Sequence, residues 1–179
     1  ITKLPWDFPD AYFDLVNTRF VTGCLSTSTW PSFLQECWRV LKPGGVMRNV
    51  EAVHMSAPTS PAVMKLSMLT YSAMHKIGVT HSPYDMAVGP VVAKILKQIG
   101  FVDVAAVPYM VDLSYDAPLH DSMGQNLGMA ATLLKSPLTR LEGISEEDFE
   151  ALRLENNRQW EEPSFCCHWH LCGVSGKKR

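Results

Sequence analysis

The sequence predicts an α/β fold, laid out as part of a doubly wound open sheet in which strands alternate with helices. Three short apolar segments of strand-like composition recur along the chain, at 13–16, 46–53 and 101–111. Helical patterns separate them, and the helix between two consecutive parallel strands packs on a face of their sheet. Because 179 residues can bury one substantial core, we expect a single domain over 1–179.

The first strand and helix are the clearest elements. The strand lies in the apolar run 11–20, which is typical of a buried parallel strand. The helix should begin near Trp30, because Pro31 then falls in the first turn, where its missing N–H costs nothing. Its apolar residues have the spacing of one helical face: Trp30, Phe33, Leu34, Cys37, Trp38 and Leu41. The turn 43–45 ends this helix, and 46–53 forms the next strand.

The second half of the sequence continues the alternation and adds an insertion. We expect a helix over 91–99, a strand over 101–111 and a last strand over 165–174. Before the last strand, 115–163 is predicted to be a helical insertion, with helices near 122–134 and 146–160. This insertion could form a lid over a bound molecule or contacts in a dimer, and the sequence leaves both open.

Composition and charge exclude several classes of partner. The formal net charge is −2 and there is no long run of Lys or Arg, so the electrostatic footprint of a nucleic-acid or anionic-membrane binder is missing. No apolar run approaches the roughly 18 residues of a membrane span, and no signal-peptide pattern opens the sequence. We therefore expect a cytoplasmic protein without a nucleic-acid or membrane partner.

The cysteines do not predict a metal site. All five lack the spacings of a zinc or redox motif, so reduced thiols are expected. Two cysteines and two histidines alternate within 166–172 and share one face if this run is a strand, but the outer sulfurs would then lie about 20 Å apart. One tetrahedral ion cannot take all four ligands.

Two motifs carry a family resemblance. Residues 4–16, LPWDFPDAYFDLV, are similar to the pattern LPF-PD-x-SFD followed by two hydrophobic residues, with one extra residue and Tyr12 in place of the common Ser. Residues 39–46, RVLKPGGV, are similar to the segment RVLKPGG, in the expected order and separation. Together they resemble class I S-adenosylmethionine-dependent methyltransferases, of the small-molecule type grouped with quinone biosynthesis. The resemblance implies the C-terminal half of a Rossmann-like sheet and methyl transfer to a small, hydrophobic or aromatic acceptor.

The resemblance also implies positions for the cofactor, S-adenosylmethionine. Ligands of open α/β sheets bind outside the carboxyl ends of the strands. The residues implied near the adenine are Ile1, Leu4 and Pro5, and those near the reacting methyl group are Asn17, Arg19 and Phe20. Leu4-Pro5 could instead form a plain turn and Phe20 could belong to the core. The Arg19 guanidinium needs a partner, either a cofactor carboxylate or an acidic side chain.

Candidates for a general base follow the second strand. Methyl transfer from a sulfonium is a direct displacement, so the protein mainly aligns the reactants and excludes water. A base is required only where the acceptor must lose a proton early. The candidates are His54, Tyr71, His75 and His81. The methionine-rich stretch 61–77 could form a lid over a hydrophobic acceptor or simply pack in the core.

The glycine loop that approaches the cofactor is not found in this sequence, and in the family it lies upstream of the Leu-Pro motif. We expect a truncated domain whose cofactor half is absent, so activity of this chain alone is not expected. Complementation by another chain and a non-catalytic interaction domain are the alternatives. A sheet cut there exposes an apolar edge, through which the chain should self-associate, for example as a homo-dimer. A nicotinamide-dependent dehydrogenase shares the doubly wound layout and is the second rival.

Overall fold

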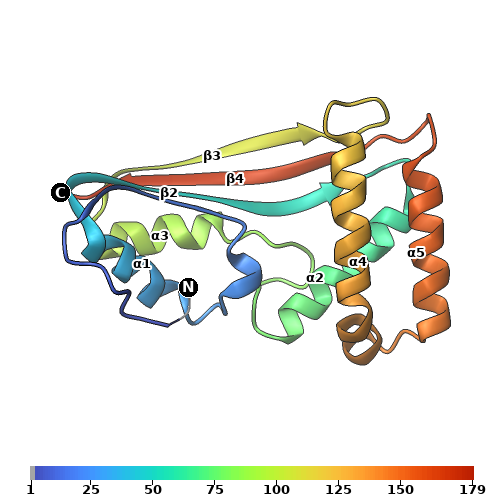
Figure 1. Cartoon of the computed structure of the whole chain (residues 1–179), viewed down its shortest axis with the longest axis horizontal. Helices are drawn as coiled ribbons and strands as arrows, with labels where there is room; N and C mark the ends of the chain where they lie inside the picture. The colour runs from blue at the N-terminus through green and yellow to red at the C-terminus, as the bar shows by residue number, and fades with distance from the viewer. Residues whose placement is uncertain (1–2) are drawn as a thin grey trace.

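The computed structural model describes residues 3–179, so Ile1 lies outside the described residues. Its centre is a four-stranded sheet, which forms the upper layer in Figure 1. The strands are β1 (Phe13–Arg19), β2 (Leu41–Ser56), β3 (Val102–Asp112) and β4 (His168–Lys177). Their spatial order is β1-β2-β4-β3, so the last strand is inserted between the second and the third.

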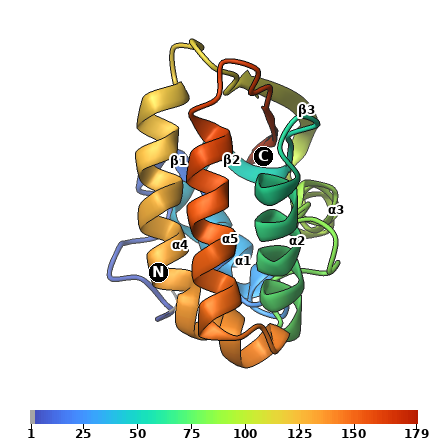
Figure 2. The same cartoon turned by 90° about the vertical axis from the view of Figure 1, so that its right-hand side faces the viewer.

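Two groups of helices accompany the sheet. The first group lies beneath one face and consists of α1 (Trp30–Val40) and α3 (Gly89–Ile99), while a short 3₁₀ turn, η1 (Thr22–Cys24), follows β1. The second group stands side by side at the far end of the sheet, as Figure 1 and Figure 2 show. It consists of α2 (Pro61–Lys76), α4 (His120–Glu142) and α5 (Glu146–Trp160).

One strand runs against the predicted parallel arrangement. β1 is parallel to β2, but β4 is antiparallel to both β2 and β3. The inserted helices return the chain to the end of the sheet at which β3 stops, and His168 at the start of β4 pairs with Asp112. A strand that starts beside the end of its neighbour must run antiparallel to it.

Both crossover helices lie on the same face of the sheet. The chain steps in one direction from β1 to β2 to β3, and successive right-handed crossovers in one direction place their helices on one side. α1 and α3 accordingly share one core with Met47 of β2 and Val174 of β4. The predicted α/β class is confirmed, but within residues 3–179 the sheet is wound on one face only.

The main core lies between this face and the helices α1 and α3. Trp30 and Phe33 are fully buried, with ring centroids 5.8 Å apart in an edge-to-face arrangement. Burial of one side chain such as Phe33 stabilises the fold by about 1.5–3 kcal/mol. A second cluster, around Val63, Trp160 and Phe165, joins the helices α2, α4 and α5 to the end of the sheet.

The inserted helices begin and end close to the predicted positions. α5 covers the predicted 146–160, and the Ser145 hydroxyl caps it by accepting from the Asp148 N–H at 3.0 Å. α4 is longer than the predicted 122–134 because it continues past Pro137 to Glu142. β4 begins at His168, three residues later than expected.

β1 is an edge strand of the sheet. Within the described residues it pairs with β2 alone. Leu15 on this strand and Tyr12 just before it are each 55% exposed. The edge at which self-association was predicted therefore carries large apolar side chains in contact with solvent.

The cysteines are unpaired thiols. Burial raises the pKa of Cys37 and of Cys167 to about 12, so both stay protonated. In the part of the chain that the structure describes, no three His, Cys, Asp or Glu side chains are arranged to hold a metal ion. None of the helices in residues 3–179 is long and apolar enough to cross a membrane.

Candidate functional site

A buried carboxylate ties the carboxyl ends of β1 and β2 together. Glu51 is 1% exposed and accepts hydrogen bonds from the backbone N–H groups of Val21 (3.0 Å) and Thr22 (3.1 Å). The Thr22 hydroxyl (2.9 Å) and the Asn49 amide (2.8 Å) donate to the same carboxylate. Both backbone donors belong to the turn that follows β1, so Glu51 fixes the path of the chain at the end of this strand.

The residues implied near the methyl group lie at this same end of β1. Asn17 and Arg19 are exposed, and in residues 3–179 no acidic side chain forms an ion pair with Arg19. Phe20 has a left-handed φ of 52°, and its ring stacks on Trp169 with centroids 5.1 Å apart. A non-glycine residue in this conformation is strained, and such residues cluster at functional sites.

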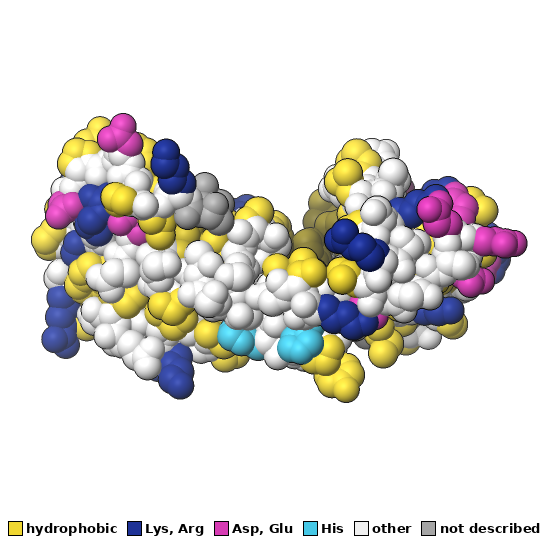
Figure 3. Space-filling view, turned by 90° about the horizontal axis from the view of Figure 1, so that it is seen from below, with side chains coloured by type: hydrophobic (Ala, Val, Ile, Leu, Met, Phe, Trp, Pro, Cys, Tyr) yellow, Lys and Arg dark blue, Asp and Glu magenta, His cyan; other side chains and the backbone are white. Residues whose placement is uncertain are grey.

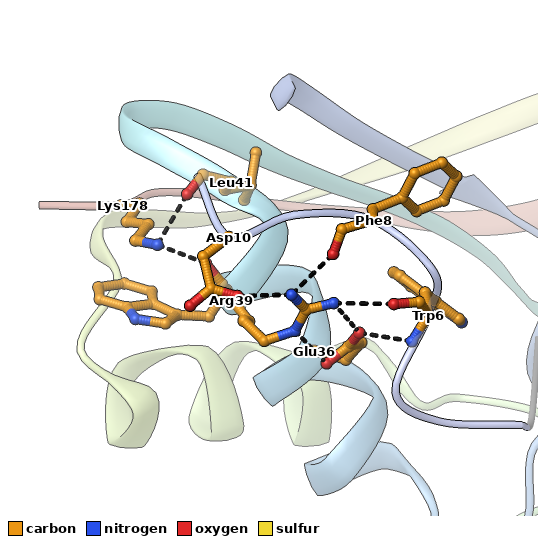
Figure 4. Close-up of polar contacts among 8 residues, drawn as sticks. Trp6, Phe8, Asp10, Glu36, Arg39, Leu41 and Lys178 are labelled. Carbon is orange, nitrogen blue, oxygen red and sulfur yellow. Dashed lines mark hydrogen bonds and ion pairs between the residues drawn. The ribbon is translucent and has the colours of Figure 1, made fainter. Parts of the chain in front are cut away.

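Arg39 holds the segment 6–10, which directly follows Leu4 and Pro5, through the contacts that Figure 4 shows. Its guanidinium donates to the Phe8 carbonyl (2.8 Å), the Trp6 carbonyl (3.1 Å) and the carboxylates of Asp10 and Glu36 (2.6 Å each). Glu36 also accepts from the Trp6 N–H at 2.7 Å. The Arg39 guanidinium, together with this N–H, holds the pKa of Glu36 below its ordinary value. The arginine of the second motif thus fixes the segment of the first motif on α1.

A cavity of about 190 Å³ lies beyond the carboxyl end of β1, between the sheet and the helices α2 and α4. Trp169, on which Phe20 stacks, forms part of its wall. Apolar side chains make up most of the rest, including Met55, Leu66, Met86, Met123, Leu127 and Leu134. Among the described residues, no charged side chain and no histidine lines it. The cavity is therefore suited to an uncharged, mainly apolar molecule.

Figure 3 shows a hollow between the two ends of the molecule, with hydrophobic side chains and some Lys or Arg side chains beside it. Charged side chains of both signs are spread over the rest of this face. This face therefore carries no continuous positive patch of the kind that binds nucleic acid.

Tyr71 is the predicted base candidate that lines the cavity. Its hydroxyl oxygen accepts from the Met55 N–H at 2.9 Å and also bonds with the Ser67 side chain. Burial raises the pKa of this hydroxyl above its ordinary value, although the Met55 N–H acts in the opposite direction. Tyr71 is therefore protonated at neutral pH and acts there as a hydrogen-bonding group.

The histidine candidates lie elsewhere. Side chains alternate along a strand, so His54 projects from the opposite face of β2 to its neighbour Met55. The His54 ring stacks on His170 of β4 with centroids 4.4 Å apart. Burial, with His54 nearby, lowers the pKa of His170. His75 is exposed, with Nδ1 3.0 Å from the Thr80 carbonyl oxygen. The fold does not bring His54, His75 and Tyr71 together.

Three polar residues at the cavity are absent from the sequence-based candidates, Ser67, Thr70 and Asn156, and only the last of them is buried. Asn156 on α5 is 7% exposed and lines the cavity. It shares the buried face of α5 with Phe149, Leu152 and Trp160. The signal in the sequence is a single amide on an otherwise apolar helical stripe, which becomes informative only once the neighbouring helices are placed.

The structure is thus an α/β domain with a cavity at the carboxyl ends of its strands, the position at which open α/β sheets bind their ligands. Residues 1–48 match the family profile described as methyltransferase domain. This match covers both motifs and confirms the predicted resemblance to class I S-adenosylmethionine-dependent methyltransferases, the enzyme family whose cofactor is S-adenosylmethionine. A search of curated proteins finds no significant match.

Solved structures with a similar arrangement share little sequence with this chain. Phosphoethanolamine N-methyltransferase 2 from Haemonchus contortus is 16% identical, and the alignment covers 97% of this chain and 35% of that one, with a TM-score of 0.47. The YcgJ protein from Bacillus subtilis is 18% identical over 98% of this chain and 68% of that one, with a TM-score of 0.49. The chain thus spans only 35% of the length of the Haemonchus enzyme.

Proposed function

We propose that this chain forms the acceptor-binding part of an S-adenosylmethionine-dependent methyltransferase that acts on a small, hydrophobic or aromatic acceptor. The observation that carries the proposal is the apolar cavity beside Phe20 and Trp169, because ligands of open α/β sheets bind outside the carboxyl ends of the strands. The family match of residues 1–48 supplies the reaction class.

Residues at the end of β1 fit one part of the cofactor. The Arg19 guanidinium is exposed and unpaired within residues 3–179, so it is available for the carboxylate of the methionine part. Asn17 shares its face of β1 and offers an amide for hydrogen bonding. Leu4 and Pro5, which directly precede the segment held by Arg39, are the proposed contacts of the adenine. S-adenosylmethionine, when bound, supplies the activated methyl group.

The chain's own part in the reaction is to orient the acceptor and exclude water. A charged acceptor is disfavoured, since an ion without a partner in an apolar cavity is costly. Tyr71 keeps its proton at neutral pH, so it is proposed to orient the acceptor rather than to remove a proton from it. Direct displacement requires little more than this alignment.

A non-catalytic role in an assembly is the second candidate function, and the exposed edge of β1 favours it. An unpaired strand edge with apolar side chains is a template for pairing with another chain. We also propose that the chain associates with a second copy through this edge. A cytoplasmic location is likewise a proposal.

Isothermal titration calorimetry of the 179-residue chain tests the proposed function. Because the glycine loop is not found in this sequence, we expect weak binding of S-adenosylmethionine, weakened about tenfold further in Arg19→Gln because a charge-assisted bond is lost. Arg140→Gln, which removes an exposed arginine from the last turn of α4, is the matched control and should bind as the parent chain does. Binding of a nicotinamide dinucleotide instead would overturn the proposal, and binding of neither would refute the proposed cofactor contact of Arg19.

A further inference from the structure

The polar side chains that line the cavity differ in whether they already have partners. Thr70 Oγ1 donates to the Leu66 carbonyl at 2.9 Å. The Tyr71 hydroxyl is engaged with the Met55 N–H and with Ser67. These three side chains, Ser67, Thr70 and Tyr71, are satisfied within the protein.

Asn156 is the exception. The residue is 7% exposed, and within residues 3–179 its side-chain amide forms no hydrogen bond with the protein. The amide is not among the fully enclosed polar atoms that lack a partner, so it keeps contact with open space. A polar group that faces open space can bind water in the empty protein, and a ligand can take the place of that water. Leu or Met at the same position of α5 would continue the apolar stripe of Phe149 and Leu152. The unpaired donors and acceptor of Asn156 thus lie at the wall of a cavity where a ligand can meet them.

The volume of the cavity limits the size of that ligand. A cavity of about 150 Å³ lined by aliphatic and aromatic side chains holds benzene. The 190 Å³ found here leaves room for one aromatic ring and a small substituent. Because no charged side chain lines the cavity, the ligand should be neutral.

We propose that the cavity binds a neutral molecule of about one aromatic ring that carries a hydroxyl or carbonyl group, and that Asn156 recognises this group by a hydrogen bond. The inference builds on the proposed function, because it names the chemical class of the acceptor. Asn156 is then a specificity-determining residue, and the apolar walls supply most of the affinity. A site built to hydrogen-bond a ligand discriminates against an analogue that lacks the polar group.

The test compares phenol with toluene, which have similar shapes and differ in the hydroxyl group. Dissociation constants of both probes are measured by ligand-observed NMR on the parent chain, on Asn156→Leu and on Asn157→Leu. Asn157 is the exposed neighbour on the same helix and is the matched control. We expect the preference for phenol over toluene to fall about tenfold in Asn156→Leu, because one buried hydrogen bond is lost, and to stay unchanged in Asn157→Leu.

A second measurement needs no substitution. The side-chain amide signals of Asn156 in a ¹⁵N spectrum should shift farther when phenol is added to the parent chain than when toluene is added, because only phenol can form a hydrogen bond with the amide. Failure of both probes to bind, or an equal preference for phenol in Asn156→Leu, would overturn the inference. Neither readout depends on the cofactor, so phenol binding without any binding of S-adenosylmethionine would contradict the proposed function alone. Binding of S-adenosylmethionine with an unchanged probe preference in Asn156→Leu would contradict the inference alone.

Discussion

Substitution of Glu51 by glutamine should destabilise the protein by about 2–4 kcal/mol. One carboxylate oxygen accepts from the Val21 N–H and the Asn49 amide, and the other accepts from the N–H and the hydroxyl of Thr22. Glutamine keeps the shape but replaces one acceptor oxygen with an NH₂ group. The Thr22 hydroxyl can rotate and accept from this group, but a backbone N–H cannot, so one buried donor loses its acceptor.

The magnitude follows from these contacts. A buried donor without an acceptor costs about 1–3 kcal/mol, and the remaining bonds to a neutral amide are weaker than bonds to a charged carboxylate by roughly 1 kcal/mol in total. Urea unfolding followed by circular dichroism measures the free energy of unfolding. Glu147→Gln changes an exposed glutamate on α5 and should shift this free energy by less than about 0.5 kcal/mol. If Glu51→Gln shifts it no more than the control does, the proposed role of Glu51 in fixing the turn after β1 is wrong.

Two further substitutions test the contacts around the site. Arg39→Lys replaces the five N–H donors of the guanidinium by the three of an ammonium group. It should lower the free energy of unfolding by about 1–2 kcal/mol, measured by thermal unfolding. Since the pKa of Glu36 is lowered in the folded state, its contribution is complete above the unfolded pKa of about 4.5 and is lost as the pH falls through the folded value. In Arg39→Lys the folded pKa should be lowered less, so this loss should be smaller and should end at a higher pH. If the melting temperatures of the two proteins depend on pH in the same way between about pH 2 and pH 6, this reasoning is wrong. Tyr71→Phe removes the acceptor of the Met55 N–H and should cost about 1 kcal/mol, and in alkaline titration the parent should retain a late-ionising tyrosine that the variant lacks.

The βαβ unit could be predicted because its signals are local. Trp30, Phe33 and Leu34 mark a helical face whatever lies around them. The predicted end of this helix at 43–45 was placed too late, because α1 ends at Val40 and 43–45 already belong to β2. The direction of β4 could not be predicted in this way. It depends on where the inserted helices α4 and α5 deliver the chain, and this is decided by their packing on α2.

The candidate site was predicted less completely than the fold. Position after the second strand suggested His54, but the alternation of side chains, with an irregularity in the pairing between Ala52 and His54, turns its ring to His170. Glu51 also lies near the end of the predicted second strand, but its carboxylate binds the turn that follows β1 and so has a structural role. Chain position identifies the strand end at which a site forms, whereas the face of the strand decides which side chains can reach it.

The contacts separate residues that fix the site from a residue that serves a ligand. Glu51 and Arg39 have their hydrogen-bonding capacity filled from within the protein, so their loss should lower stability first and binding only as a consequence. Asn156 has the opposite character, because it lines the cavity and its amide forms no hydrogen bond with the described residues. Asn156→Leu should therefore leave the melting temperature nearly unchanged while it weakens the preference for a polar ligand. A residue whose removal impairs recognition without lowering the stability of the empty protein is retained for binding, and this difference distinguishes a ligand-recognition role of Asn156 from a packing role.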